Sequence, residues 1–301
     1  MSQRVSPSTG RAYGLQRTCR ALSVPRSTLY AVRARRQRAT PLQKRGPKTA
    51  WTDGELTEHI REILAQCPFV GEGYRKVWAR LRLAGIRTSK GRVLRLLREV
   101  GLLAPTRVGP PHGPKVHDGT IIPDRPDAMW GTDATSALTD EGTATIFVAI
   151  DHFTAECVGI HAARRGTRFE ALEPLRQGIQ AHFAAYGEQV AAGLALRHDH
   201  GSQFMSDLFQ AELRFLGITS SPAFVREPEG NGCAERFIRT LKEQLLWVEH
   251  FATVEDLRQA LLAFRERYNR EWLIGRHGYR SPTATAALRT HCPAPARGHP
   301  Y

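Results

Sequence analysis

A strongly β-branched run, TATIFVAID at residues 143–151, limits more than any other segment what this chain can fold into. The segment WGTDATSAL before it alternates and is joined to it by the turn TDEG, and AECVGIHAA supplies a third strand. Helical patterns at 167–186 and 202–216 then alternate with short strands at 194–199 and 218–220, and further helices follow at 235–247 and 253–269. We therefore expect a mixed five-stranded α/β sheet with helices on its faces.

Positive charge is concentrated in the first part of the chain. Residues 1–115 contain 24 Lys and Arg against 6 Asp and Glu, whereas the remainder has a net charge of −4 within a total of +14. This uneven charge indicates that residues 1–115 bind a polyanion and that residues 116–301 have a different function. A solvated basic tail is the alternative.

The compartment follows from the first residues and the cysteines. No apolar run approaches the roughly 18 residues needed to cross a bilayer, and the basic N-terminus lacks the apolar core of a secretory signal. The five cysteines are scattered and form no C-x-x-C pair, so neither a zinc site nor a disulfide framework is indicated. We expect a protein of the reducing cytoplasm with no membrane partner.

Residues 1–40 are predicted to contain two short helices. GLQRTCRALSV carries one apolar helix face, and after a break at Ser23-Val24-Pro25, Ser27 is the expected N-cap of RSTLYAVRARR. This is a partial helix-turn-helix segment, although an ordinary helical hairpin gives the same pattern. Its exposed arginines are Arg26, Arg33, Arg35 and Arg36. The Pro- and Lys/Arg-rich stretch 39–50 is expected to be a mobile linker.

A stronger helical pattern at residues 51–104 predicts a helix-turn-helix DNA-binding domain. Thr52 and Glu55 form a capping-box pair before the first helix, and Tyr74 to Leu83 supply the second. Ser89 caps the third, KGRVLRLLREV, whose basic face could meet phosphates and guanine edges in a major groove. A solvated basic helix face is again the alternative. The residues of this face are Lys90, Arg92, Arg95 and Arg98.

Two further segments separate and end the domains. Residues 105–127 are rich in proline and lack periodicity, as is typical of an interdomain linker. The strand-containing domain is expected to span 128–290, and residues 291–301 to form a flexible tail.

Three acidic residues are placed where strands and a helix could bring them together. Asp133 lies midway along the first predicted strand, and Asp199 ends the fourth. Glu235 follows with 35 residues between the two acids, on a helix whose period places Lys242 on the same face. Carboxylates from separate elements could hold two divalent metal ions about 3.5–4 Å apart, and such a pair activates a water or 3′-hydroxyl nucleophile.

Five short motifs add to this set. They are W-x-T-D at Trp130–Asp133, D-H-F-T from Asp151, H-D-H-G-S-Q-F at His198–Phe204, N-G-C-A-E-R-F at Asn231–Phe237 and T-L-K-E at Thr240–Glu243. Through these five motifs, residues 129–285 resemble the integrase core of the OrfB-type transposases of insertion sequence family 3. That family shares the RNase-H-like fold of retroviral integrases, and the 35-residue gap and the Lys seven positions after the Glu are its signature. Residues 55–103 resemble the helix-turn-helix segment that precedes this core.

The resemblance implies an RNase-H-like five-stranded sheet, preceded by all-α helix-turn-helix domains, with a DDE catalytic site. Asp133, Asp199 and Glu235 would be catalytic and would ligate two Mg²⁺ ions, with Mn²⁺ able to substitute. Lys242 would contact phosphate. The implied reaction is cleavage of insertion-element ends and joining of the 3′-OH to a target phosphodiester.

The resemblance also implies partners and a location. The partners are double-stranded DNA (terminal inverted repeats and target), further copies of the chain at the synapse, and an upstream-frame DNA-binding protein, fused or associated. The location would be the cytoplasm, in association with the nucleoid.

Residues beside the predicted ligands have less specific roles. Gln203 and Asn231 are candidate DNA contacts, with capping of the adjacent loops as the alternative. His198 and His200 flank Asp199 and are expected to support its backbone, and Asp151 closes a strand without ligating metal.

Two other functions compete with that of a transposase. One is a catalytically inactive, transposase-derived DNA-binding regulator, and the intact carboxylates argue against it. The other is a structure-selective nuclease on the same fold, which would not need two N-terminal helix-turn-helix units.

Overall fold

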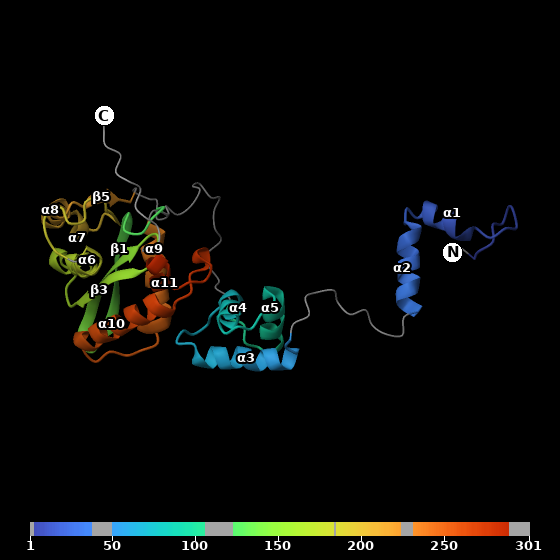
Figure 1. Cartoon of the computed structure of the whole chain (residues 1–301), viewed down its shortest axis with the longest axis horizontal. Coiled ribbons are helices and arrows are strands. Elements are labelled where there is room, and N and C mark those ends of the chain that lie inside the picture. Colours follow the sequence, from blue (N-terminus) through green and yellow to red (C-terminus); the bar gives the residue numbers. More distant parts are fainter. Residues whose placement is uncertain (1–2, 38–49, 106–122, 184, 224–230, 289–301) are drawn as a thin grey trace, which may run out of the picture. The chain divides into compact units, whose positions relative to one another are not determined.

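A computed structural model describes residues 3–37, 50–105, 123–183, 185–223 and 231–288 of the chain (Figure 1). Contacts divide the chain into two compact units, Met1–Ala50 and Trp51–Tyr301. The predicted tail at 291–301, the linker at 39–49 and most of the linker at 105–127 fall outside the described residues.

The first unit contains the two predicted helices, α1 (Gly14–Ala21) and α2 (Arg26–Gln37), after a bridge between Val5 and Ala12. The predicted N-cap at Ser27 is wrong, because α2 already begins at Arg26 and Ser27 lies inside it. Cys19 is the buried apolar side chain of this unit's described residues. The helix-turn-helix assignment of this segment remains a prediction.

The second unit begins with three helices, α3 (Asp53–Gln66), α4 (Tyr74–Leu83) and α5 (Lys90–Glu99). The capping box at the start of α3 is confirmed, since the Thr52 hydroxyl accepts from the Glu55 N–H and Glu55 accepts from the Thr52 N–H. Ser89 caps α5 in the same way, through the Arg92 N–H. These caps satisfy amide groups that a helix start leaves unpaired. The helices enclose a small core of Leu56, Ile60, Val77, Leu81, Val93, Leu96 and Leu97.

The rest of the second unit is built on one sheet with strand order β3-β2-β1-β4-β5. The first three strands form the predicted antiparallel meander, and β4 and β5 add in parallel beside β1. The bounds are β1 Met129–Thr139, β2 Gly142–Asp151, β3 Cys157–Ala163, β4 Ala195–His198 and β5 Thr219–Pro222. This order is the RNase-H-like topology, so the predicted fold class is confirmed.

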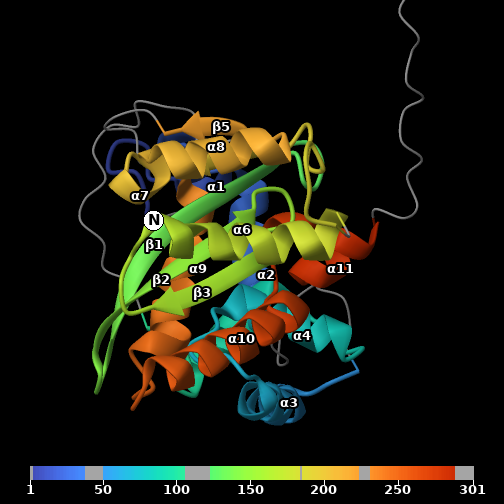
Figure 2. The same cartoon turned by 90° about the vertical axis from the view of Figure 1, so that its left-hand side faces the viewer.

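Helices cover both faces of this sheet. Figure 2 shows α6 (Arg168–Phe183) and α8 (Asp207–Leu216) across the face turned to the viewer, with α9 (Gly232–Leu241) behind the strands. The remaining elements are α7 Ser202–Met205, the π-helix η2 Lys242–Leu246, α10 Val254–Glu271, the 3₁₀ helix η3 Gly275–His277 and α11 Pro282–Ala286. None of the described helices combines the length and hydropathy needed to cross a bilayer.

Two of the predicted helices are interrupted. The segment 202–216 breaks at Ser206, which is extended and caps α8 through the Phe209 N–H. The segment 235–247 changes from α-helix to π-helix at Lys242. Single-turn π-helices of this kind occur frequently at functional sites.

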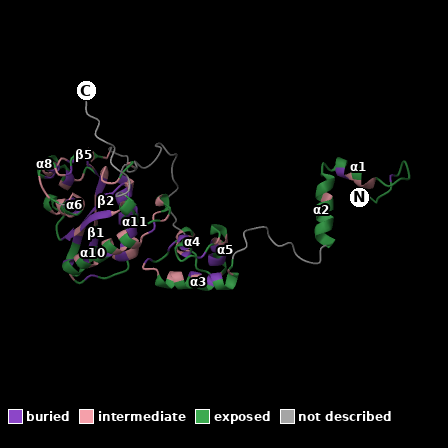
Figure 3. Cartoon of the chain, in the orientation of Figure 1, coloured by how far each residue is buried: buried purple, intermediate pink, exposed green. Residues whose placement is uncertain are grey.

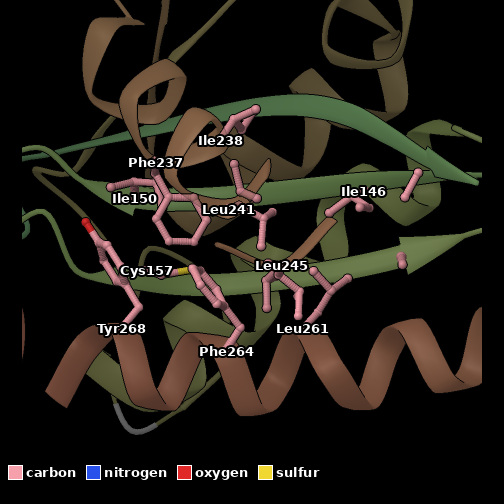
Figure 4. Close-up of a cluster of buried hydrophobic side chains, with 14 of the residues drawn as sticks. Ile146, Ile150, Cys157, Phe237, Ile238, Leu241, Leu245, Leu261, Phe264 and Tyr268 are labelled. Atoms are coloured by element: carbon pink, nitrogen blue, oxygen red, sulfur yellow. The ribbon is translucent and has the colours of Figure 1, made fainter. Parts of the chain in front are cut away.

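Each face of the sheet has its own core, and many of the strand residues are coloured as buried in Figure 3. One core joins Trp130 and Phe147 to α6, α7 and α8. Figure 4 shows the other, in which Phe237, Leu241 and Phe264 from the α9 and α10 side pack on Ile146 and Ile150. Apolar surface buried at about 25 cal/mol per Å² is the main stabilising contribution here.

A short turn attaches the three-helix segment to the strand-containing domain. Phe69, in the turn between α3 and α4, is 2% exposed and its ring contacts Trp272 edge-on at 4.9 Å. Beside it, the Val70 N–H donates to Gln244 Oε1 (2.8 Å), and Gln244 Nε2 donates to the Val70 carbonyl (2.9 Å). Gln244 belongs to η2, so the turn is attached to the helix that also carries Lys242.

Candidate active site

Two adjacent parallel strands bring Asp133 and Asp199 to one side of the sheet. The parallel register pairs Gly131 on β1 with Arg197 on β4, and each aspartate lies two residues beyond its paired residue. Because side chains alternate along a strand, Asp133 and Asp199 point to the same face as Gly131 and Arg197. His198 points to the opposite face, where its ring contacts Phe204 at 5.9 Å.

Helix α9 covers the face to which the two aspartates point. Its inner side packs Ala234, Phe237 and Leu241 into the core of Figure 4, while Glu235 is on the exposed side. Lys242 directly follows α9, seven residues after Glu235, which is nearly two turns at 3.6 residues per turn. Glu235 and Lys242 therefore lie along one side of the helix, as predicted.

The charges of all four residues interact at Asp133. The pKa of Asp133 is raised to about 6, chiefly by burial and also by the negative charges of Asp199 and Glu235, while the Ala134 N–H and Lys242 act to lower it. Partial burial also raises the pKa of Glu235, against the effect of Arg239. Three carboxylates with one nearby ammonium give a site of excess negative charge, which favours a cation.

The carboxylates are close enough to interact but are not gathered around one point. Among the described residues, no three His, Cys, Asp or Glu side chains already converge in a geometry that could hold a metal ion. Two of the acids are instead turned to nearby amides, since Asp133 Oδ1 accepts from the Ala134 N–H and Asp199 Oδ1 from the Gly201 N–H, both at 2.8 Å. Like charges repel at short range, so their spread is expected without a cation between them.

The donor set nevertheless fits a hard divalent cation. Three carboxylates supply only oxygen ligands, which suit Mg²⁺ and Mn²⁺. A bound cation would offset the burial and the mutual repulsion that together hold the pKa of Asp133 at about 6. Asp133, Asp199 and Glu235 are the residues that would hold it.

Gln203 lies beside Asp199. A Cβ built on Gly201 would come within 2.6 Å of Gln203 Nε2 and 2.9 Å of Asp199 Oδ1, so the amide and the carboxylate lie over the same turn. Gln203 thus borders the site, and its contact with DNA remains a proposal.

Asn231 occupies the start of α9 but does not cap it with its side chain. The side chain is buried, and its Nδ2 donates to the Thr132 carbonyl at 2.9 Å. Thr132 directly precedes Asp133 in the chain. Asn231 therefore links the start of the Glu235 helix to the strand of Asp133, a role that agrees better with the structural alternative than with a DNA contact.

The predicted supporting residues behave as expected. His198 is buried between the Asp199 carbonyl (2.7 Å from Nδ1) and Ser220 Oγ (2.9 Å from Nε2), and burial lowers its pKa. His200 Nε2 is 2.7 Å from the Ala223 carbonyl. Asp151 is fully buried and accepts from the Thr154 N–H and hydroxyl and from the Asp127 N–H. All three fix the backbone around the site.

Gly131 is a site residue that the sequence analysis missed. A Cβ at this position would lie 2.6 Å from both Asn231 Oδ1 and His152 Nε2. The close approach of Asn231 to β1 thus requires glycine two residues before Asp133. The signal was present in the Trp-Gly-Thr-Asp order, because a glycine inside a strand often marks a close approach of other groups.

The basic face predicted on α5 is divided. Arg92 Nε donates to Asp53 Oδ1 (2.7 Å), and Arg95 is paired with both Asp53 and Glu99. The Lys90 ammonium lies 4.5 Å from the centre of the Trp78 ring. Arg92 and Arg95 therefore already have carboxylate partners, whereas Lys90 has an aromatic one. Arg98 also lies on α5, and its contact with DNA remains a prediction.

The fold and the organisation of the chain are those of an enzyme with an integrase core, a polynucleotidyl transferase. The family model described as "Integrase core domain" matches residues 216–282, and that described as "HTH-like domain" matches residues 52–109. The first of these contains Glu235 and Lys242, but not the two aspartates. The chain thus combines a DNA-binding type of domain with a catalytic core of the integrase type.

Curated relatives extend the likeness over most of the chain. It is 24% identical over 292 residues to "Transposase InsD for insertion element IS2A/D/F/H/I/K" of Escherichia coli, covering 90% of each. It is also 24% identical over 297 residues to "Insertion element IS2A uncharacterized 48.2 kDa protein" of Escherichia coli, covering 92% of this chain and 65% of that protein. The resemblance to insertion-element transposases that the sequence predicted is confirmed by these relatives.

Solved structures with a similar backbone include two integrases. The simian T-cell lymphotropic virus intasome, in complex with a regulatory subunit of protein phosphatase 2A, is matched with TM-score 0.49 and 19% identity, over 80% of this chain and 78% of that one. The catalytic core domain of BIV integrase is matched with TM-score 0.41 and 22% identity, over 55% of this chain and 97% of that one.

Proposed function

We propose that this chain is a DNA transposase that cleaves the ends of an insertion element and joins each exposed 3′-OH to a target phosphodiester. The observation that carries the proposal is the interaction of Asp199, Glu235 and Lys242 with the partly buried carboxyl of Asp133. Four residues from two strands and one helical segment lie close enough for their charges to interact, on a fold of the integrase type. The names of the curated relatives support the reaction class.

Each residue has a proposed role. Asp133, Asp199 and Glu235 would hold two Mg²⁺ ions, or Mn²⁺ in their place, and such ions would activate the nucleophile and stabilise the leaving oxygen. Lys242 binds phosphate at the element end through its ammonium. Gln203 lies where it can contact the same DNA strand as Lys242. Asn231 and Gly131 hold α9 against β1 and so position Glu235 relative to Asp133.

The proposed partners follow from this reaction. They are double-stranded DNA of the terminal inverted repeats and of the target, bound with the help of the helix-turn-helix domain at 51–104. Joining two ends also requires further copies of the chain at the synapse, and an upstream-frame DNA-binding protein is proposed as a fused or associated partner. The proposed setting is the cytoplasm, on nucleoid DNA.

Strand cleavage and joining on DNA that carries the element's own ends test the proposal. Wild-type protein with Mg²⁺ should nick at the ends and transfer them to a target, and Asp199→Asn should abolish both while retaining end binding. The loss should be on the order of a hundredfold to a thousandfold or more, because electrostatic stabilisation of the reacting phosphate is typically the largest contribution to rate. Asp207→Asn, an exposed acid at the start of α8, is the matched control and should stay active. Cleavage by Asp199→Asn would contradict the assignment of Asp199 as a metal ligand. An inactive wild type that still binds ends would favour the DNA-binding regulator.

Lys242 is tested separately in the same assay. Lys242→Ala should slow the joining of precut ends by more than any loss of folded protein explains. The reason is that its ammonium lies on the same side of the helix as Glu235. Joining at the wild-type rate would remove Lys242 from the site.

A further inference from the structure

A small hollow borders the helix-turn-helix domain and a turn of the catalytic domain, away from the carboxylates. It has a volume of about 170 Å³ and is lined by Trp78, Ala79, Arg82 and Leu83 from α4 and its end, and by Gly278 and Tyr279. The Trp78 and Tyr279 rings meet edge to face, with centroids 5.8 Å apart and an interplanar angle of 73°. Leu83 is 71% exposed at the rim.

Two cations surround the aromatic pair. The Arg82 guanidinium lies 4.9 Å and the Lys90 ammonium 4.5 Å from the Trp78 centroid, and Lys90 is also 5.8 Å from the Tyr279 centroid. Among the residues that the structure describes, neither cation has a carboxylate within ion-pair distance. Arg92 and Arg95, which lie on α5 with Lys90, do have a carboxylate partner, because both form ion pairs with Asp53. Two positive charges without a carboxylate partner among the described residues, Arg82 and Lys90, therefore lie at the hollow.

The chain holds Tyr279 there in an uncommon backbone conformation. Its φ is +64°, a left-handed value that residues other than glycine rarely adopt. Hydrogen bonds from the Tyr279 N–H to the Ile274 carbonyl (3.0 Å) and from the Ile274 N–H to the Arg280 carbonyl (2.9 Å) close the turn. His277 and Arg276 attach the turn to the Phe153 carbonyl. Strain that the surroundings enforce on an aromatic residue is typical of a binding position.

Trp78 is fixed as well. Its indole N–H donates to the Thr88 carbonyl at 2.8 Å, which sets the ring orientation and leaves no donor for a ligand. The hollow therefore offers aromatic rings and cationic side chains but few hydrogen-bond donors that could read a base edge.

We propose that this hollow binds an unpaired nucleotide of DNA, with its base on the aromatic pair and its phosphates against Arg82 and Lys90. The proposal rests on the proposed function for its choice of DNA. Aromatic rings bind bases by stacking without sequence preference, and cations supply the attraction for phosphate. A base within a duplex is already stacked, so the nucleotide must come from a strand end or an unpaired stretch. The site would hold the end of a strand while the carboxylates act elsewhere on it.

The test compares binding of the full-length chain to one short duplex in three forms, without divalent metal: blunt, with a thymidine tail, and with an equal abasic tail. The wild type should bind the thymidine tail on the order of tenfold more tightly than the abasic tail, given the usual contribution of one stacked base. Tyr279→Gly should lose this preference while folding at least as well, because glycine suits the φ of +64°. Tyr279→Phe should keep it.

The cations are tested through the salt dependence of binding. Arg82→Gln with Lys90→Gln should reduce the slope of log K against log salt by about two, at roughly one unit per lost phosphate contact. Arg92→Gln with Arg95→Gln, the matched pair already bound to Asp53, should change it less. Equal binding of thymidine and abasic tails by the wild type, or an undiminished preference in Tyr279→Gly, would overturn the proposal. Since no strand cleavage enters this assay, a failure here is distinguishable from a failure of the transposase assignment.

Discussion

The ionised carboxylate of Asp133 is electrostatically unfavourable in the folded chain, and the fold alone does not require this charge. Its carboxyl is partly buried and lies near two other acids, so that its pKa rises from 3.8 to about 6. At neutral pH the carboxyl is therefore mostly ionised, although its surroundings disfavour the charged form. Proteins retain such costs where a charge is needed for function.

This cost predicts an unusual pH dependence of stability. Between about pH 4 and 6 the folded chain binds a proton at Asp133 that the unfolded chain has lost, so stability falls as pH rises and the full cost is present above about pH 6. Asp133→Asn should thus raise the free energy of unfolding by about 1–3 kcal/mol at pH 8, as measured in urea with a chelator present. The gain should disappear near pH 4, and the Asp207→Asn control should show none. A variant less stable than the wild type at pH 8 would contradict this account of the pKa.

A second residue-scale prediction concerns the fit of α9 against β1. Gly131→Ala would place a Cβ 2.6 Å from Asn231 Oδ1 and from His152 Nε2. We expect it to lower the free energy of unfolding by about 1–3 kcal/mol, as overpacking commonly does, and to reduce strand cleavage by displacing Glu235. Gly232→Ala is the matched control, because nothing lies within 4 Å of its new Cβ. If the two variants behave alike in urea unfolding and cleavage assays, Asn231 does not position the helix.

At the scale of elements, the sequence predicted the strands better than the helix interruptions. The five strands followed from β-branched runs and short turns, and the two caps at Thr52 and Ser89 followed from residue type. The break at Ser206 and the π-helix at 242–246 did not, because the apolar pattern continues through both. They depend on packing and hydrogen bonds formed by the folded chain, such as the contact of Gln244 with Val70.

That contact leads to a prediction about the turn between α3 and α4. Phe69→Ala should lower the stability of the second unit by about 3–5 kcal/mol, since the ring is 2% exposed within the core of the sheet. Val70→Ala is the control: the Val70 side chain is 76% exposed, and its backbone bonds to Gln244 are kept. Tryptophan fluorescence during urea unfolding should show a second transition in Phe69→Ala alone. A single transition, with a stability equal to that of Val70→Ala, would show that the turn does not join the two parts.

At the scale of the whole molecule, net charge predicted where DNA would bind but not through which residues. The excess of Lys and Arg in residues 1–115 is real, yet several of these cations are compensated. Arg80 binds the buried Glu72, and Arg92 and Arg95 share Asp53. Sequence alone could not separate paired from unpaired arginines, because Asp53 lies some 40 positions away and meets them only through folding.

The sequence likewise indicated one part of the candidate site and not the other. Its three carboxylates stand in recognisable motifs, and the structure places them close enough for their charges to interact, while their role as ligands remains a proposal. Gly131 and the link from Asn231 to Thr132 were not predictable, since they act through close contacts between segments distant in sequence. The hollow beside Trp78 and Tyr279 was likewise unpredictable, because its two aromatic residues come from different domains.

Metal ligation by the three carboxylates is the central claim, and a change of ligand tests it most directly. Asp199→Cys replaces a hard oxygen ligand with a softer thiolate, which binds Mg²⁺ poorly but accepts softer divalent ions. In the strand-cleavage assay, Asp199→Cys should be inactive in Mg²⁺ and regain activity in Mn²⁺, while Asp207→Cys stays active in both. Cleavage by Asp199→Cys in Mg²⁺ at the wild-type rate would contradict the claim.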